Sequence, residues 1–178
     1  MINTHEIIQE VYLQPGQWYF GGGRTRIRTV LGSCVSITLW HPTLYIGGIC
    51  HYMLVDRGQI RSGAVLGLDG RYADEVIDLL VNQLRRHKTN PSDYQVKLFG
   101  GGNMFESLGR KGQATNVAER NVKAGRKLLH SHGFKTVAEH VGGFGHRQVI
   151  FELWSGDVWV KHVGTNAVGA GRRQDGLS

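Results

Sequence analysis

The alternation of apolar and polar residues around position 35 is typical of a strand with one buried face. Three apolar positions enclose two polar ones there, in the order Val35, Ser36, Ile37, Thr38 and Leu39. A period of two indicates a half-buried β-strand. A second apolar run covers residues 45–54, and the segment between the runs contains Pro42, a residue that favours turns. Together the two runs predict a β-hairpin.

Two longer stretches, residues 72–87 and 116–132, have the apolar spacing of amphipathic helices. Asn116 is expected to cap the second helix, and Gly133 follows its end. Shorter apolar runs predict strands at residues 5–12, 17–20, 27–30, 94–99, 135–141, 147–153 and 157–163. Because most strands follow one another as hairpins, we expect an α+β fold with two main helices and a mixed, mostly hairpin-connected sheet.

We expect a single domain over residues 1–163 of the 178-residue chain, followed by a flexible, glycine-rich tail over residues 164–178. No apolar run is long enough to cross a bilayer, which predicts no membrane insertion. Residues 1–20 lack the continuous apolar segment of a signal peptide. The chain has only two cysteines, and one of them is a candidate nucleophile, so a reducing compartment is favoured and the expected location is the cytoplasm.

The formal net charge of +7 indicates attraction to an acidic partner. Basic residues cluster at residues 24–28, 85–88, 120–127 and 172–173. No zinc-ligand spacing, RNP-like sequence or helix-turn-helix pattern is present, so we expect no nucleic-acid partner. An acidic protein surface fits the charge, and for any one cluster an ordinary solvated basic surface is the simpler explanation.

The predicted hairpin brings a thiol and an imidazole together. If its turn is centred between Pro42 and Thr43, Cys34 lies directly opposite His51 on a polar, water-accessible face. Directly opposed side chains have Cβ atoms roughly 4.5–5.5 Å apart. A cysteine beside a histidine is an activated nucleophile, so both residues are candidate catalytic groups. Cys50 falls on the opposite face and is expected in the core.

Residues next to Cys34 extend this candidate site. The Gly32–Ser33 turn could present backbone N–H groups to an oxyanion during attack on an amide carbon. Thr29 could either orient His51 or hold the substrate carbonyl, and the sequence does not choose between these roles. We expect no metal or cofactor, because the nine histidines have no metal-ligand spacing and Gly100–Gly102 is not a dinucleotide-binding fingerprint.

Several motifs together resemble those of the CheD family, the chemoreceptor glutamine deamidases. They are Thr29-Val30-Leu31-Gly32-Ser33-Cys34-Val35, His51-Tyr52-Met53-Leu54, Arg71-Tyr72-Ala73, Lys97-Leu98-Phe99-Gly100-Gly101-Gly102-Asn103-Met104-Phe105, Glu119-Arg120-Asn121-Val122 and Val141-Gly142-Gly143. The resemblance covers residues 12–163. Three positions depart from the family's usual pattern: Val55 replaces a proline, His140 replaces an aspartate, and His146 is an additional residue.

The resemblance implies a function and a layered fold. It implies conversion of receptor glutamines to glutamates with release of ammonia, with Cys34 as nucleophile, His51 as its base and Thr29 as the third site residue. It also implies an α/β/α-type sandwich similar to that of bacterial toxins that deamidate glutamine. The partners it implies are the cytoplasmic helical domains of chemoreceptors and, in some bacteria, a CheC-type phosphatase.

Two other functions remain open at this point. The same residues would suit a thiol esterase acting on receptor glutamyl methyl esters, which only analysis of the product distinguishes. A non-catalytic binding module for a receptor or a phosphatase is the alternative from a different class, and an unreactive Cys34 would favour it.

Overall fold

The computed structural model describes residues 7–58, 67–104 and 113–164, and the expected tail over residues 165–178 lies outside this part of the chain. The side chains of residues 113–116 are likewise outside the description. The described part contains nine strands in two mixed sheets and two α-helices, which confirms the α+β class.

The two sheets have different sizes. One has four strands in the order β1-β3-β8-β9, comprising Gln9–Tyr12, Thr25–Leu31, His146–Glu152 and Val158–Val163. The other has five in the order β2-β5-β4-β6-β7, comprising Trp18–Gly22, Ile46–Tyr52, Val35–His41, Gln95–Gly100 and Thr136–Val141. Each sheet contains one parallel pair, β1 with β3 and β6 with β7.

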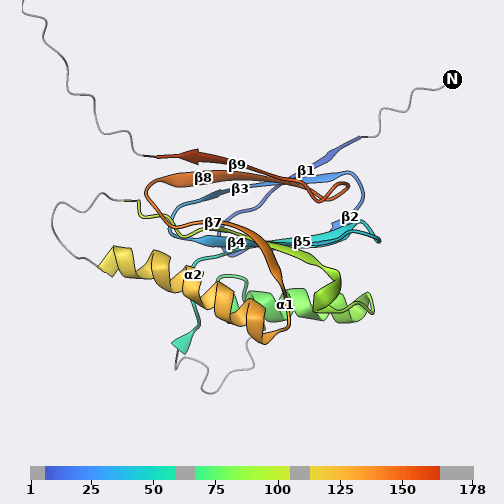
Figure 1. Cartoon of the computed structure of the whole chain (residues 1–178), viewed down its shortest axis with the longest axis horizontal. Coiled ribbons are helices and arrows are strands. Elements are labelled where there is room, and N and C mark those ends of the chain that lie inside the picture. Colours follow the sequence, from blue (N-terminus) through green and yellow to red (C-terminus); the bar gives the residue numbers. More distant parts are fainter. Residues whose placement is uncertain (1–6, 59–66, 105–112, 165–178) are drawn as a thin grey trace, which may run out of the picture.

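Both helices lie on one face of the five-stranded sheet, and the four-stranded sheet covers its other face (Figure 1). Helix α1 covers Ala73–Arg86, helix α2 covers Gln113–Ser131, and a short 3-10 helix, η2, covers Pro91–Asp93. The layers are therefore sheet, sheet and helices, which corrects the expected α/β/α order. Asn116 is inside α2, so its predicted role as the helix cap is wrong.

The layer between the five-stranded sheet and the helices is the main apolar core. Cys50 is fully buried there, as predicted, beside Tyr52 and the apolar face of α1. Burial raises the pKa of the Cys50 thiol to about 12, so this cysteine stays protonated at neutral pH. Cys50 is therefore a structural residue in the described fold.

The layer between the two sheets is a mixture of apolar and polar side chains. Its apolar part includes Ile27, Leu31 and Phe151, all fully buried. Five buried polar residues lie on the strand faces that meet here: Thr29, Ser36, Thr38, His51 and Arg147. Buried polar groups need partners, so their hydrogen bonds indicate how this layer is organised.

Candidate functional site

The hairpin register differs from the prediction. His51 pairs with Ser36, and the last pair of the β4–β5 ladder is Val35 with Tyr52. Cys34 therefore lies one position before the ladder begins and is diagonal to His51, not directly opposite it. Because the shift is by two residues, the side chains of Cys34 and His51 still belong to the same face of the sheet.

The turn conformation explains the shift. Its residues are Pro42–Tyr45, between the terminal strand residues His41 and Ile46. The Nδ1 atom of His41 accepts hydrogen bonds from the backbone N–H groups of Thr43 and Leu44, at 3.3 and 3.2 Å. Tyr45 adopts a left-handed φ of 53° and donates its N–H to the carbonyl of His41 at 3.0 Å. The centre of the turn thus lies between Thr43 and Leu44, one residue beyond the predicted centre, and the turn is two residues longer on its C-terminal side.

Thr29 orients the imidazole of His51 across the gap between the sheets. Its Oγ1 lies 2.8 Å from Nδ1 of His51, and its hydroxyl donates to the carbonyl of Leu13 at 2.9 Å. Since a carbonyl can only accept, the hydroxyl proton belongs to the bond with Leu13, and Nδ1 of His51 must be the donor to Thr29. The proton on Nδ1 leaves the lone pair of the neutral ring on Nε2.

The Nε2 atom of His51 is placed to act as a base. His51 is 2% exposed, and Nε2 has no hydrogen-bond partner in the described part of the chain. Burial lowers the pKa of His51 to about 4, so the ring is neutral at pH 7. A neutral imidazole with a free Nε2 can accept the proton of a neighbouring thiol.

Cys34 is half-buried beside the small apolar cluster of Leu31, Phe99 and Val149. Burial raises the pKa of its thiol, whereas its own backbone N–H and the Ser33 side chain act in the opposite direction. At neutral pH the thiol of Cys34 and the imidazole of His51 are therefore both neutral.

Three glycines at the end of β6 and directly after it pack against the turn that carries Cys34. The N–H of Gly101 donates to the carbonyl of Cys34 at 2.8 Å, and the N–H of Gly102 donates to that of Gly32 at the same distance. Gly100 has a φ of 107°, and a Cβ there would collide with the carbonyl of Cys34. These glycines serve backbone packing around the cysteine.

Not all site predictions agree with the structure. The face that carries His51 is closed by the other sheet, and Ser36 and Thr38 on it are at most 1% exposed. It is polar, but it is not the open, wet surface that we expected. Gly32 and Ser33 do lie directly beside Cys34, and the side chain of Met104 packs so closely against Gly32 that it would have to shift to admit a Cβ there.

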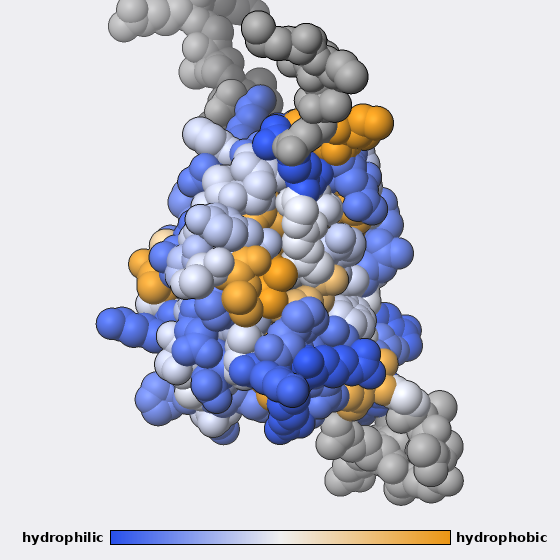
Figure 2. All heavy atoms as spheres, turned by 90° about the vertical axis from the view of Figure 1, so that its right-hand side faces the viewer, coloured by the Kyte–Doolittle hydropathy of each residue, from blue (hydrophilic) through white to orange (hydrophobic). Residues whose placement is uncertain are grey.

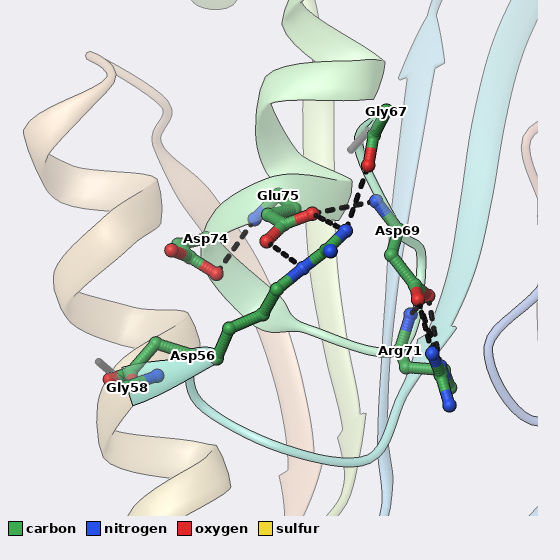
Figure 3. A network of polar contacts seen from close by, with 8 residues as sticks. Asp56, Gly58, Gly67, Asp69, Arg71, Asp74 and Glu75 are labelled. Atoms are coloured by element: carbon green, nitrogen blue, oxygen red, sulfur yellow. Dashed lines mark hydrogen bonds and ion pairs between the residues drawn. The ribbon is translucent and has the colours of Figure 1, made fainter. Parts of the chain in front are cut away.

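A network of charged residues supports the chain that follows His51 (Figure 3). The buried carboxylate of Glu75 forms an ion pair with Arg57 at 2.6 Å and accepts the N–H of Asp69 at 2.7 Å. Asp69 in turn binds Arg71. The carbonyl of Arg71 accepts the N–H groups of the two residues after Tyr52, so the network holds the end of β5 in place.

Sequence reasoning missed two buried polar residues near the site. Asn121 of α2 is 1% exposed and binds backbone carbonyls on both sides of the site. Arg147 is 2% exposed, lies between the sheets opposite Leu31 and donates through Nε to Nδ1 of His140 at 2.8 Å. A polar residue on the apolar face of a predicted helix or strand was the available signal in both cases.

A pocket of about 550 Å³ reaches His51 and Thr29 from the outer side of the four-stranded sheet. Apolar side chains contribute most of its wall, and the basic residues Arg28 and Lys161 also line it. Among the described residues, no group of three or more His, Cys, Asp and Glu side chains could hold a metal ion. None of the described helices is long and apolar enough to span a membrane.

Comparison with known proteins agrees with the motifs. The sequence profile of the family described as CheD chemotactic sensory transduction matches residues 53–162. A probable chemoreceptor glutamine deamidase CheD 3 of Dechloromonas aromatica is 48% identical over 86% of this chain and 87% of its own length. The corresponding probable deamidase of Pseudomonas savastanoi is 46% identical over 94% and 92%. The chain belongs to the CheD family.

The buried, neutral His51 predicts a specific dependence of stability on pH. Between pH 6.5 and about 4, the unfolded chain binds a proton at His51 that the folded protein does not bind. The free energy of unfolding should therefore fall as the pH is lowered, by up to about 3 kcal/mol from this residue. The measurement is urea unfolding of the wild type and of His51→Gln at several pH values.

In that comparison His51→Gln should lack this part of the acid destabilisation. His130→Ala, which removes an exposed histidine of α2, is the matched control and should retain it. Equal loss of stability with falling pH in the wild type and in His51→Gln would contradict a buried neutral imidazole.

Proposed function

We propose that this protein deamidates glutamine side chains of chemoreceptors to glutamate, with Cys34 as nucleophile and His51 as its base. The observation that carries the proposal is the Thr29–His51 hydrogen bond, which leaves a free Nε2 on the face that Cys34 shares. Membership of the CheD family and the deamidase names of the relatives support the substrate. The reaction would take place in the cytoplasm, on the cytoplasmic helical domain of the receptor.

In the first half of the reaction, Nε2 of His51 takes the proton of Cys34 as the sulfur attacks the side-chain amide carbon of the substrate. The resulting tetrahedral intermediate carries a negative oxygen, and we assign the backbone N–H groups of Gly32 and Ser33 as its donors. The C–N bond then breaks, and protonated His51 returns its proton to the nitrogen that leaves as ammonia.

In the second half, a water molecule loses a proton to Nε2 of His51 and attacks the thioester carbon. The C–S bond breaks, Cys34 regains its proton, and the product is a glutamate side chain. The sum is amide plus water giving carboxylate plus ammonium, so the reaction requires no cofactor. The Thr29 hydroxyl accepts Nδ1–H and donates its own proton to Leu13, so it has no donor left for the substrate carbonyl, which favours the orienting role.

The outer pocket offers a docking surface for the receptor helix. Tyr12, Val30 and Trp159 line it and are 69%, 57% and 60% exposed, on the sheet face that neither helix covers. A large exposed apolar group of this kind marks an interaction site. With Arg28 and Lys161 beside it and a net charge of +7 on the chain, an acidic amphipathic helix is the complementary partner.

We propose a CheC-type phosphatase as a second partner, on the family resemblance alone. The esterase alternative uses the same two residues, and analysis of the product separates it from deamidation.

The first test incubates purified receptor cytoplasmic fragments with each variant and follows the mass increase of glutamine-to-glutamate conversion by mass spectrometry. Cys34→Ser should abolish conversion, and His51→Ala should reduce turnover roughly 10²–10⁴-fold, the usual contribution of positioned proton transfer. His130→Ala is the control and should retain wild-type turnover. Conversion by Cys34→Ser at the wild-type rate would contradict the mechanism, and hydrolysis of methyl esters alone would favour the esterase.

A second test addresses docking. Trp159→Ala removes an exposed side chain from the pocket, so KM for the receptor fragment should rise roughly 5–30-fold with little change in kcat, as expected for a side chain that contributes about 1–2 kcal/mol to binding. Val137→Ala is the matched control, because Val137 is 52% exposed on β7 of the other sheet. Equal KM values for the two variants would exclude this surface as the docking site.

A further inference from the structure

The backbone ladder that joins β4 to β5 stops just before the cysteine. The last pair is Val35 with Tyr52, and one further pair would join Cys34 to Met53. That pair is not part of the ladder. The N–H of Met53 donates to the carbonyl of Arg71 at 2.9 Å, and the carbonyl of Cys34 accepts the N–H of Gly101. Both bonds point away from the seam between β4 and β5, and among the described residues no backbone hydrogen bond joins the turn that carries Cys34 to the chain that follows Tyr52.

A side chain from α2 bridges the two segments where the ladder ends. The amide nitrogen of Asn121 donates to the carbonyl of Ser33 at 3.2 Å and to that of Met53 at 2.7 Å. Ser33 directly precedes Cys34, and Met53 is two residues beyond His51. One planar amide group thus holds both carbonyls, and its two N–H bonds point in fixed directions. Its burial protects both hydrogen bonds from competition by water.

We propose that Asn121 is the positioning residue that sets the separation between Cys34 and His51, by linking their two segments beyond the end of the β4–β5 ladder. This inference rests on the proposed Cys–His mechanism. Proton transfer from Cys34 to Nε2 of His51 requires a short, aligned contact, and a displacement of about 1 Å can reduce turnover by about 10²-fold. Asn121 does not touch the reacting atoms and acts only through the backbone of the two segments.

Asparagine suits this position because it has two donors on one atom. Aspartate has the same shape, but its carboxylate would place acceptor oxygens against two carbonyls. Alanine would leave both carbonyls without this partner at a partly buried position, which costs stability. A role limited to anchoring α2 would predict loss of stability without a selective effect on the chemical step.

Tyr52 provides the matched control. Its hydroxyl donates to the backbone carbonyl of Asn121 at 2.7 Å, and Tyr52 is fully buried. Tyr52→Phe therefore removes a buried hydrogen bond between the same helix and the same strand, but it leaves the amide of Asn121 on Ser33 and Met53. A comparison of the two variants separates anchoring of α2 from positioning of Cys34.

The experiment measures deamidation of a receptor fragment per folded molecule. Asn121→Ala should lower kcat roughly 10–10²-fold with KM within about two-fold of the wild type, because the loss is in alignment and not in substrate binding. Tyr52→Phe should keep kcat within about two-fold of the wild type. Equal kcat values for the two variants, at comparable loss of thermal stability, would overturn the proposal. If Asn121→Ala does not fold, Asn121→Ser, which keeps a single donor, is read by the same criteria.

Alkylation of Cys34 by iodoacetamide at pH 7 is a second measurement that needs no substrate. Release of the Ser33 segment should hydrate the half-buried thiol and bring its raised pKa back toward the ordinary value, so labelling should be several-fold faster in Asn121→Ala. Slower turnover with faster labelling is the expected signature, and Tyr52→Phe should show neither. Unchanged labelling of Cys34 would contradict the positioning role of Asn121. A wild type without deamidase activity would instead refute the proposed function, and the difference in labelling between the two variants would then remain as the test of the Asn121 bridge.

Discussion

The hydrogen bond between Thr29 and His51 is the interaction on which the rest of the site depends. It joins the two sheets, since Thr29 belongs to β3 and His51 to β5. Because the Thr29 hydroxyl donates to Leu13, the bond also determines which ring nitrogen of His51 carries the proton. Burial keeps that ring neutral. The free lone pair on Nε2, and hence the proposed base, follows from these three facts together.

Cys34 is held by a different set of contacts, which come from segments far apart in the sequence. Gly101 binds its carbonyl, Gly100 allows the close approach of the two backbones, and Asn121 binds the carbonyl of the preceding residue. The proposed nucleophile is thus positioned from the end of β6 and from α2, whereas the proposed base is positioned from β3 and β5. This division explains why a cysteine and a histidine of one hairpin need supports from both sides of the five-stranded sheet.

Much of the fold could be predicted from periodicity, because strands and amphipathic helices repeat their apolar positions. The face shared by Cys34 and His51 was also predictable, since a register error of two residues does not exchange the faces of a strand. Direct opposition of the two residues was wrong because the turn depends on His41 and Tyr45, whose conformations have no signature in the apolar pattern. The α/β/α order of the layers, which the family resemblance implied, was wrong, and the apolar pattern could not correct it because an apolar face does not indicate which element will cover it.

Contacts between distant segments could not be read from the sequence at all. The expected role of Thr29 was left open, and only its position across the sheets from His51 favours the orienting role. The hydrogen-bond partner of Arg147 could not be predicted either. His140 stands where the family resemblance led us to expect an aspartate, and it accepts a hydrogen bond from Arg147. The contact between Thr29 and His51 joins residues more than twenty positions apart, and the contact between Arg147 and His140 depends on a residue that departs from the family pattern.

The most direct test of the account is nitrogen NMR of the His51 ring in protein labelled with ¹⁵N-histidine, with His51→Gln used to assign the signals. At pH 7 the account predicts a neutral ring with the proton on Nδ1, and titration only near pH 4. Thr29→Val, which removes the acceptor but keeps the shape, should abolish the preference for that tautomer. A ring that is charged at pH 7, or neutral with its proton on Nε2, would contradict the assignment of His51 as the base for Cys34.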